Sequence, residues 1–138
     1  MIDISPFAQR IKSAPKWKIP IKIKVDDDIF DFSKTPEAIK LRQALANALH
    51  VWSNQSNTHF CDKASQYLLP FVRRLYPDAS LIKIRPKGVN YHIFILFGVD
   101  KVLDTQLSQF NVPEKVAKTY IFHLPKYLRM IKGGLNAS

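Results

Sequence analysis

The pattern of apolar and polar residues is clearest between Leu81 and Val99, the most apolar stretch of the chain. At its start, Ile82 and Ile84 alternate with Lys83 and Arg85. A period of two is typical of a β-strand with one buried face and one wet face. The pattern therefore predicts a strand whose isoleucines point into a core and whose two cations point outward.

A turn and a second strand follow. Pro86 and Gly88 are residues that favour turns, because proline presets φ and glycine accepts a positive φ. The run from Val89 to Phe97 begins half-polar and ends apolar on both faces, since Phe94 and Leu96 lie opposite the main apolar side. A strand that is apolar on both faces suits the centre of a covered sheet. The stretch thus predicts a β-hairpin with its second strand at the sheet centre.

A second alternating segment runs from Trp17 to Val25. Its apolar residues share one face, and Lys18, Lys22 and Lys24 lie on the other. Pro20 cannot donate a hydrogen bond to a neighbouring strand, so the pattern predicts a strand at the edge of the sheet.

Apolar residues at helical spacing predict four to five helices, over about residues 4–12, 35–52, 58–75, 102–110 and 114–124. Pro125 is expected to kink or end the last of these, with a continuation of a turn or two as far as Ile131. Thr35 and Pro36 are typical of a helix start, and Pro70 predicts a kink inside the third helix. We expect an α+β fold in a single domain, residues 1–138. The expected sheet has three strands, an edge strand plus the β-hairpin, and the helices cover it.

The segment from Val102 to Tyr120 also has some features of a helix-turn-helix motif. Residues 111–113 would form its turn, and residues 114–124 would form the helix that reads a nucleic-acid groove. The alternative is an ordinary pair of helices packed on the sheet.

Charge narrows the classes of partner. The 138 residues carry a formal net charge of +10 and have a pI near 9.8. Such a balance favours nucleic acid, an anionic membrane surface or an acidic protein as partner.

Cys61 is the only cysteine, which excludes an intramolecular disulfide and fits a reducing compartment. No signal-peptide pattern or spanning apolar segment is evident, so a cytoplasmic location, or a nuclear one in a eukaryote, is expected.

The candidate binding residues are cations on the two expected strands. If both strands pack their apolar faces into one core, their cations share one outer sheet surface, with Asn90, Tyr91 and His92 near its rim. Phe94 and Leu96 require cover on that same side, so part of this surface is expected to lie under a helix. The predicted nucleic-acid-binding residues are Lys18, Lys22, Lys24, Lys83, Arg85, Lys87 and His92.

A second constellation is acidic. Asp26, Asp27, Asp28 and Asp31 lie close together, and neighbouring carboxylates can hold a divalent metal. A small metal-dependent nuclease or toxin using this Asp26–Asp31 cluster is therefore an alternative. The spacing matches no known Ca²⁺ loop, and a solvated turn after a strand explains the same residues. No motif points to a zinc site, a phosphate loop or another cofactor.

These observations favour a small basic nucleic-acid-binding or accessory protein without catalysis, which contacts the phosphate backbone through a cationic sheet face. Besides the nuclease, a binding module for an acidic protein partner remains an alternative. The sequence does not distinguish DNA from RNA.

Overall fold

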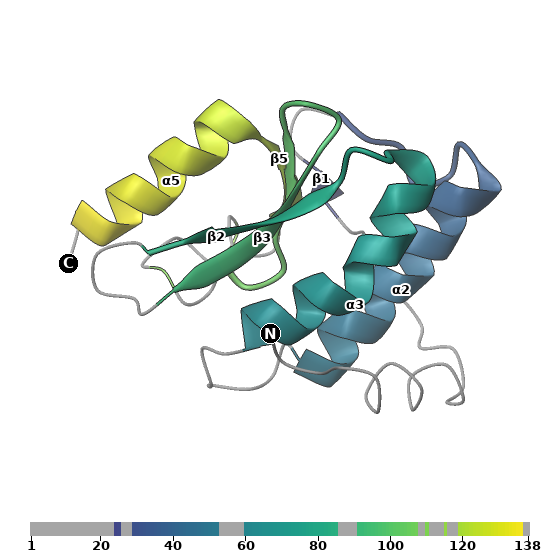
Figure 1. The fold of residues 1–138 in the computed structure, drawn as a ribbon, viewed down its shortest axis with the longest axis horizontal. Coiled ribbons are helices and arrows are strands. Elements are labelled where there is room, and N and C mark those ends of the chain that lie inside the picture. The colour runs from purple at the N-terminus through teal and green to yellow at the C-terminus, as the bar shows by residue number, and fades with distance from the viewer. Residues whose placement is uncertain are drawn as a thin grey trace.

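The computed structural model describes residues 24–25, 29–52, 60–85, 91–107, 110, 115 and 119–136 (Figure 1). Within these residues the fold is α+β, with helices on both faces of one mixed sheet. The predicted fold class is therefore confirmed. The expected helix over residues 4–12 and most of the expected strand from Trp17 to Val25 lie outside the described residues.

Across the described ranges the sheet has five strands in the order β1-β5-β4-β3-β2. The pairs β2–β3, β3–β4 and β4–β5 are antiparallel, and the short β1 lies parallel to β5. The bounds are β1 Lys24–Val25, β2 Ser80–Ile84, β3 His92–Phe97, β4 Lys101–Leu103 and β5 Thr119–His123. The predicted hairpin is present as β2 and β3, and β3 lies inside the sheet as predicted.

Three helices are described: α2 (Pro36–Trp52), α3 (Phe60–Leu75) and α5 (Leu124–Asn136). The Thr35 Oγ1 accepts a hydrogen bond of 3.1 Å from the backbone N–H of Ala38, which caps the start of α2 as the sequence predicts. Pro70 lies inside α3, as predicted.

Helices lie on both faces of the sheet (Figure 1), and each face has its own core. On one face, α2 and α3 pack against Ile95, Phe97, Leu103 and Ile121. On the other face, α5 packs through Tyr127 and Ile131 against sheet residues that include Phe94, Val102 and Phe122. Because successive strand residues point to opposite faces, the central strands β3, β4 and β5 contribute to both cores.

Two predicted helices are wrong in part. The segment expected to be a helix from residue 102 begins with β4. The segment expected to be a helix from residue 114 contains β5, and only its end, from Leu124 on, is helical as predicted, in α5. Val102 and Leu103 are adjacent apolar residues whose side chains enter opposite cores. In a short window, two adjacent apolar residues resemble the apolar spacing of a helix. The helix-turn-helix prediction is wrong for the same reason, since strands occupy both of its ends.

The number of elements also differs from the prediction. In the described residues the sheet has five strands instead of three. The same residues contain three helices, whereas four to five were expected over the whole chain, one of them outside the described residues. The two extra central strands separate β1 from the β2–β3 hairpin. This separation changes where the predicted cations lie.

A tight turn joins β3 to β4. Gly98 has φ 57° and Val99 has φ 72°. The N–H of Asp100 donates to the carbonyl of Gly98 at 2.9 Å. The carboxylate of Asp78 accepts one hydrogen bond from the N–H of Gly98 and one from that of Val99, each 3.1 Å long. Asp78, just before β2, thereby fixes the turn that follows β3.

Candidate nucleic-acid interface

The two strands expected to share a cationic surface lie at opposite edges of the sheet. β1 and β2 are the first and last strands in the sheet order, with three strands between them. At about 4.8 Å per neighbouring strand, roughly 19 Å separate the backbones of β1 and β2. Lys24 and Lys83 thus lie on opposite edges instead of on one joint surface. Lys18, Lys22 and Lys87 lie outside the described residues.

The apolar residues of β2 divide between the two cores. Ile82 and Ile84 pack against the core on the α5 side, and Leu81 packs against the core on the α2–α3 side. Lys83 and Arg85 follow Leu81 at steps of two, so they point to the α2–α3 side of the sheet. The condition for one shared cationic surface, a single core behind the sheet, is therefore not met, because each face of the sheet has its own core.

The expected cover over Phe94 and Leu96 is confirmed. Both residues belong to the core under α5, where the Phe94 and Tyr127 rings lie 4.9 Å apart between centroids. A cationic surface cannot extend over this part of the sheet.

On the α2–α3 side of the hairpin, the side chains become more exposed to solvent toward one end of the two strands. On β3, residues Phe97, Ile95 and Ile93 are buried, whereas Tyr91, which precedes the strand, is half-buried. Along β2 the exposure also increases in the direction of Tyr91, from half-buried Leu81 to exposed Lys83 and Arg85. The same end of both strands is therefore the open one.

An aromatic ring and two cations meet at this open end. Lys83 pairs with Ile93 in the strand register, so the next cross-strand neighbours on that face are Arg85 and Tyr91. The Nζ of Lys83 lies 4.7 Å from the centroid of the Tyr91 ring, a cation–π distance. We refer to Lys83, Arg85 and Tyr91 as the hairpin-end surface.

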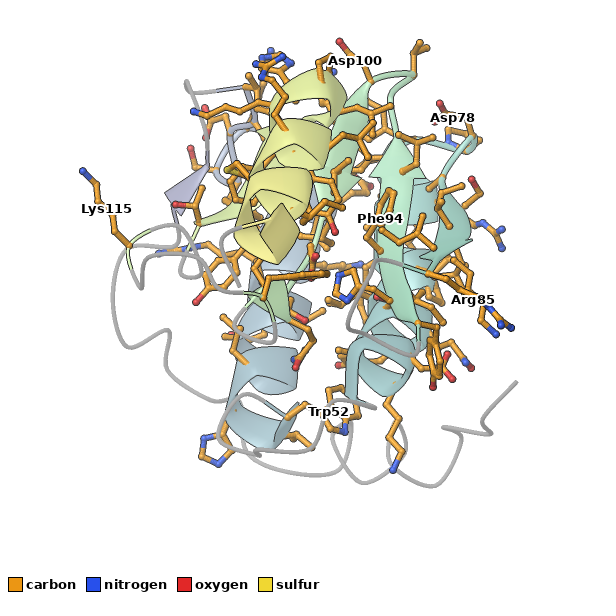
Figure 2. The ribbon with its side chains drawn as sticks, turned by 90° about the vertical axis from the view of Figure 1, so that its left-hand side faces the viewer. Trp52, Asp78, Arg85, Phe94, Asp100 and Lys115 are labelled. Carbon is orange, nitrogen blue, oxygen red and sulfur yellow. The ribbon has the colours of Figure 1, made fainter. Side chains whose placement is uncertain are left out.

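The carboxylates nearest in sequence lie at the other end of the hairpin. Asp78 precedes β2 and Asp100 follows β3, and both lie near the top of Figure 2, well above Arg85. Within the described residues, the salt bridges join His92 to Asp104, and Lys101 and His123 to Asp100. Lys83 and Arg85 take part in none of them. The hairpin-end surface thus carries two charges that this part of the chain does not neutralise.

His92 was predicted near the rim of the cationic surface, and this placement is wrong. Its side chain is fully buried. His92 shares a sheet face with Phe94, which α5 covers, and its ring meets the ring of Phe110 edge-on at 4.8 Å. A side chain in this position cannot contact a phosphate in solvent.

His92 belongs instead to a buried polar network centred on Asp104. Asp104 Oδ2 is 2.6 Å from Nε2 of His92 and accepts a 2.5 Å hydrogen bond from the Tyr127 hydroxyl. Its Oδ1 accepts a 2.7 Å hydrogen bond from the N–H of Gln106. The exposed fractions of His92, Asp104 and Tyr127 are 0%, 1% and 0%. Such a His–Asp pair can support general-base catalysis where a substrate can reach it. Here both side chains are buried, and Asp104 links α5 to the sheet through the Tyr127 hydroxyl.

Sequence reasoning did not identify Asp104. The available signal was a single acidic residue between Val102, Leu103 and Leu107, all of which are buried. A buried carboxylate requires hydrogen-bond donors, so an acid in an apolar stretch predicts a polar partner. Its partners come from β3 and α5, which the sequence does not place beside it.

The described part of the acidic segment forms a turn. The Oδ1 of Asp31 accepts hydrogen bonds from the Ser33 hydroxyl at 2.7 Å and from the Ser33 N–H at 2.9 Å. The Ser33 hydroxyl and then the Ser33 N–H lower the pKa of this exposed carboxyl. Asp26, Asp27 and Asp28 lie outside the described residues. Among the residues that are described, no three potential metal ligands come together.

No protein-family model, curated protein or solved structure matches this chain. Among the helices in the described parts of the chain, none is both long and apolar enough to cross a membrane.

Proposed function

We propose that this chain is a small, non-catalytic nucleic-acid-binding protein that contacts phosphates through the hairpin-end surface. One observation carries this function: exposure increases along β2 and β3 toward the same end, where Lys83, Arg85 and Tyr91 meet. The proposed site is smaller than the sheet face expected from the sequence. It keeps Lys83 and Arg85 and omits His92.

Electrostatics supports phosphate as the ligand. Lys83 and Arg85 are exposed and take part in none of the salt bridges of the described residues. A phosphate that pairs with such a cation releases condensed counterions, which makes binding favourable at low salt. The net charge of +10 adds a long-range attraction for any polyanion.

The test compares two double variants with the same change in charge. Lys83→Ala with Arg85→Ala removes the proposed contacts, and Lys115→Ala with Arg129→Ala removes two other exposed cations. Lys115 and Arg85 lie on opposite sides of the molecule in Figure 2, and Arg129 is on α5. Affinity for nucleic acid is measured by fluorescence polarisation over a series of salt concentrations.

The first pair is expected to weaken binding and to reduce the slope of log affinity against log salt by about two, one for each lost phosphate contact. The control pair is expected to change the slope by less. Equal effects of the two pairs, or an unaltered protein that binds no nucleic acid at low salt, would contradict the proposed function.

The same cations also favour the other expected partner, an acidic protein. Competition separates the two classes: a bound nucleic acid is challenged with a polyglutamate peptide of equal total charge. Nucleic acid is the partner we favour, because the aromatic ring can stack on a base while the two cations beside it bind phosphates. If the peptide binds more tightly than the nucleic acid, the acidic-protein alternative is correct.

A further inference from the structure

We infer that the hairpin-end surface binds single-stranded nucleic acid, with a base stacked on the Tyr91 ring and phosphates on Lys83 and Arg85. Single-strand binding at this surface rests on the nucleic-acid binding proposed above and specifies its substrate class. Three features of the hairpin lead to it: helices on both of its faces, an aromatic ring at its open end, and cations spaced along one strand.

The helices prevent the described part of the hairpin from entering a duplex groove. A two-stranded β-ribbon can enter the major groove of DNA, which is about 12 Å wide, only if at least one of its faces is free. Here α3 is held against β3 by a 3.4 Å hydrogen bond from the Ser65 hydroxyl to the carbonyl of Ile93. On the opposite face, Tyr127 of α5 packs on Phe94. A ribbon with a helix on each face is too thick for the groove.

The Tyr91 ring favours an unpaired base. In the structure the ring is in contact with the Lys83 ammonium, at 4.7 Å. Stacking of a base on an aromatic side chain is stronger than a cation–π contact at an exposed site. A base can therefore replace the ammonium on the ring, and the ammonium then turns to the phosphate of that nucleotide. Bases inside a duplex are already stacked on one another and cannot make this exchange.

The spacing of the cations suits a strand that runs along β2. Lys83 and Arg85 are two residues apart and point to the same side, so their α-carbons lie about 7 Å apart. Exposure on this side is confined to the end of the hairpin, since Leu81 already packs against the core. The surface thus contacts a short length of one backbone, as expected for a site that holds a few nucleotides.

The experiment measures binding of three labelled probes of equal length: a single strand, its duplex, and the same single strand with abasic sites. The protein variants are Tyr91→Ala and Tyr91→Phe, and circular-dichroism melts check their folding. The single strand is expected to bind the unaltered protein about tenfold more tightly than the duplex or the abasic strand. Tyr91→Ala should lower affinity for the intact single strand about tenfold and leave the other two probes unchanged. Tyr91→Phe keeps the ring and should bind like the unaltered protein.

Equal binding of the single strand and the duplex overturns the inference. Equal binding of the intact and abasic strands overturns it too, and this comparison needs no variant that might fail to fold. In either case the proposed function stands if the Lys83 and Arg85 double variant still loses affinity. Failure of all three probes to bind at low salt overturns both.

Discussion

The hydroxyl of Tyr127, on α5, donates a 2.5 Å hydrogen bond to Oδ2 of Asp104, which directly follows β4. The same oxygen lies 2.6 Å from Nε2 of His92 on β3. One buried carboxylate oxygen therefore connects the neighbouring strands β3 and β4 to α5, whose Tyr127 lies 23 residues after Asp104. Because α5 covers one face of the sheet through Tyr127 and its neighbours, this contact helps to close the second core.

Tyr127→Phe is expected to destabilise the fold by about 2 kcal/mol, because it removes a buried hydrogen bond to a carboxylate and leaves the ring in place. The measurement is urea unfolding followed by circular dichroism. Tyr76→Phe is the matched control: Tyr76 is half-buried, and its ring packs on Phe97. The control should change stability by less than about 0.5 kcal/mol. If Tyr127→Phe loses no more stability than Tyr76→Phe, the hydrogen bond from the Tyr127 hydroxyl does not contribute to the stability of the fold.

Asp104→Asn is expected to cost more than Tyr127→Phe, about 3 kcal/mol or above. The amide has nearly the same shape, but it weakens all three hydrogen bonds that the carboxylate accepts, from His92, Gln106 and Tyr127. Because the two substitutions act on one network, the double variant should lose less stability than the sum of the single losses. Strict additivity in the same urea experiment would contradict a shared network.

The turn between β3 and β4 contains a strained residue. Val99 has φ 72° and its side chain is 85% exposed. A β-branched residue is unfavourable at this φ, and so exposed a side chain contributes little packing in return. Val99→Asn is expected to stabilise the protein by about 1 kcal/mol, since asparagine tolerates a left-handed conformation. Val99→Thr keeps the β-branch and should bring no such gain. Equal thermal melting temperatures for the two variants would argue against strain at this position.

The elements that the sequence predicts correctly are those with local signals. Thr35 and Pro36 mark the start of α2, and the alternation from Ile82 to Arg85 identifies β2. These patterns depend on neighbours in the chain, so they can be recognised without knowledge of the tertiary structure.

The strands β4 and β5 are short and central, and their patterns do not alternate between apolar and polar residues. Both pair with strands on each side, and both contribute to the two cores. What identifies them as strands is therefore their tertiary partners.

Pro125, which the sequence predicts to kink or end a helix, lies in the first turn of α5. There its missing N–H is not needed by the helix.

The candidate site shows the same limit. Alternation correctly places Lys83 and Arg85 on one side of β2, and both are exposed. The position of β1 at the far edge follows only from the sheet order. The side that each helix covers follows only from the packing of the two cores. His92 has the face that alternation gives it, but α5 buries that face.

The pKa of Asp31 provides a local test of the turn before α2. Hydrogen bonds from the hydroxyl and then the N–H of Ser33 lower this pKa below its ordinary value. A carboxyl whose pKa is lower in the folded state contributes stability above its unfolded pKa, near pH 4, and loses it as the pH falls through the folded pKa. Ser33→Ala removes the hydroxyl donor and keeps the N–H, so the pKa of Asp31 should rise part of the way toward its ordinary value. Ser33→Thr keeps a hydroxyl and should leave the pKa low. Titration of the Asp31 carboxyl carbon by NMR measures both, and identical pKa values in the two variants would exclude the Ser33 hydroxyl as the main cause.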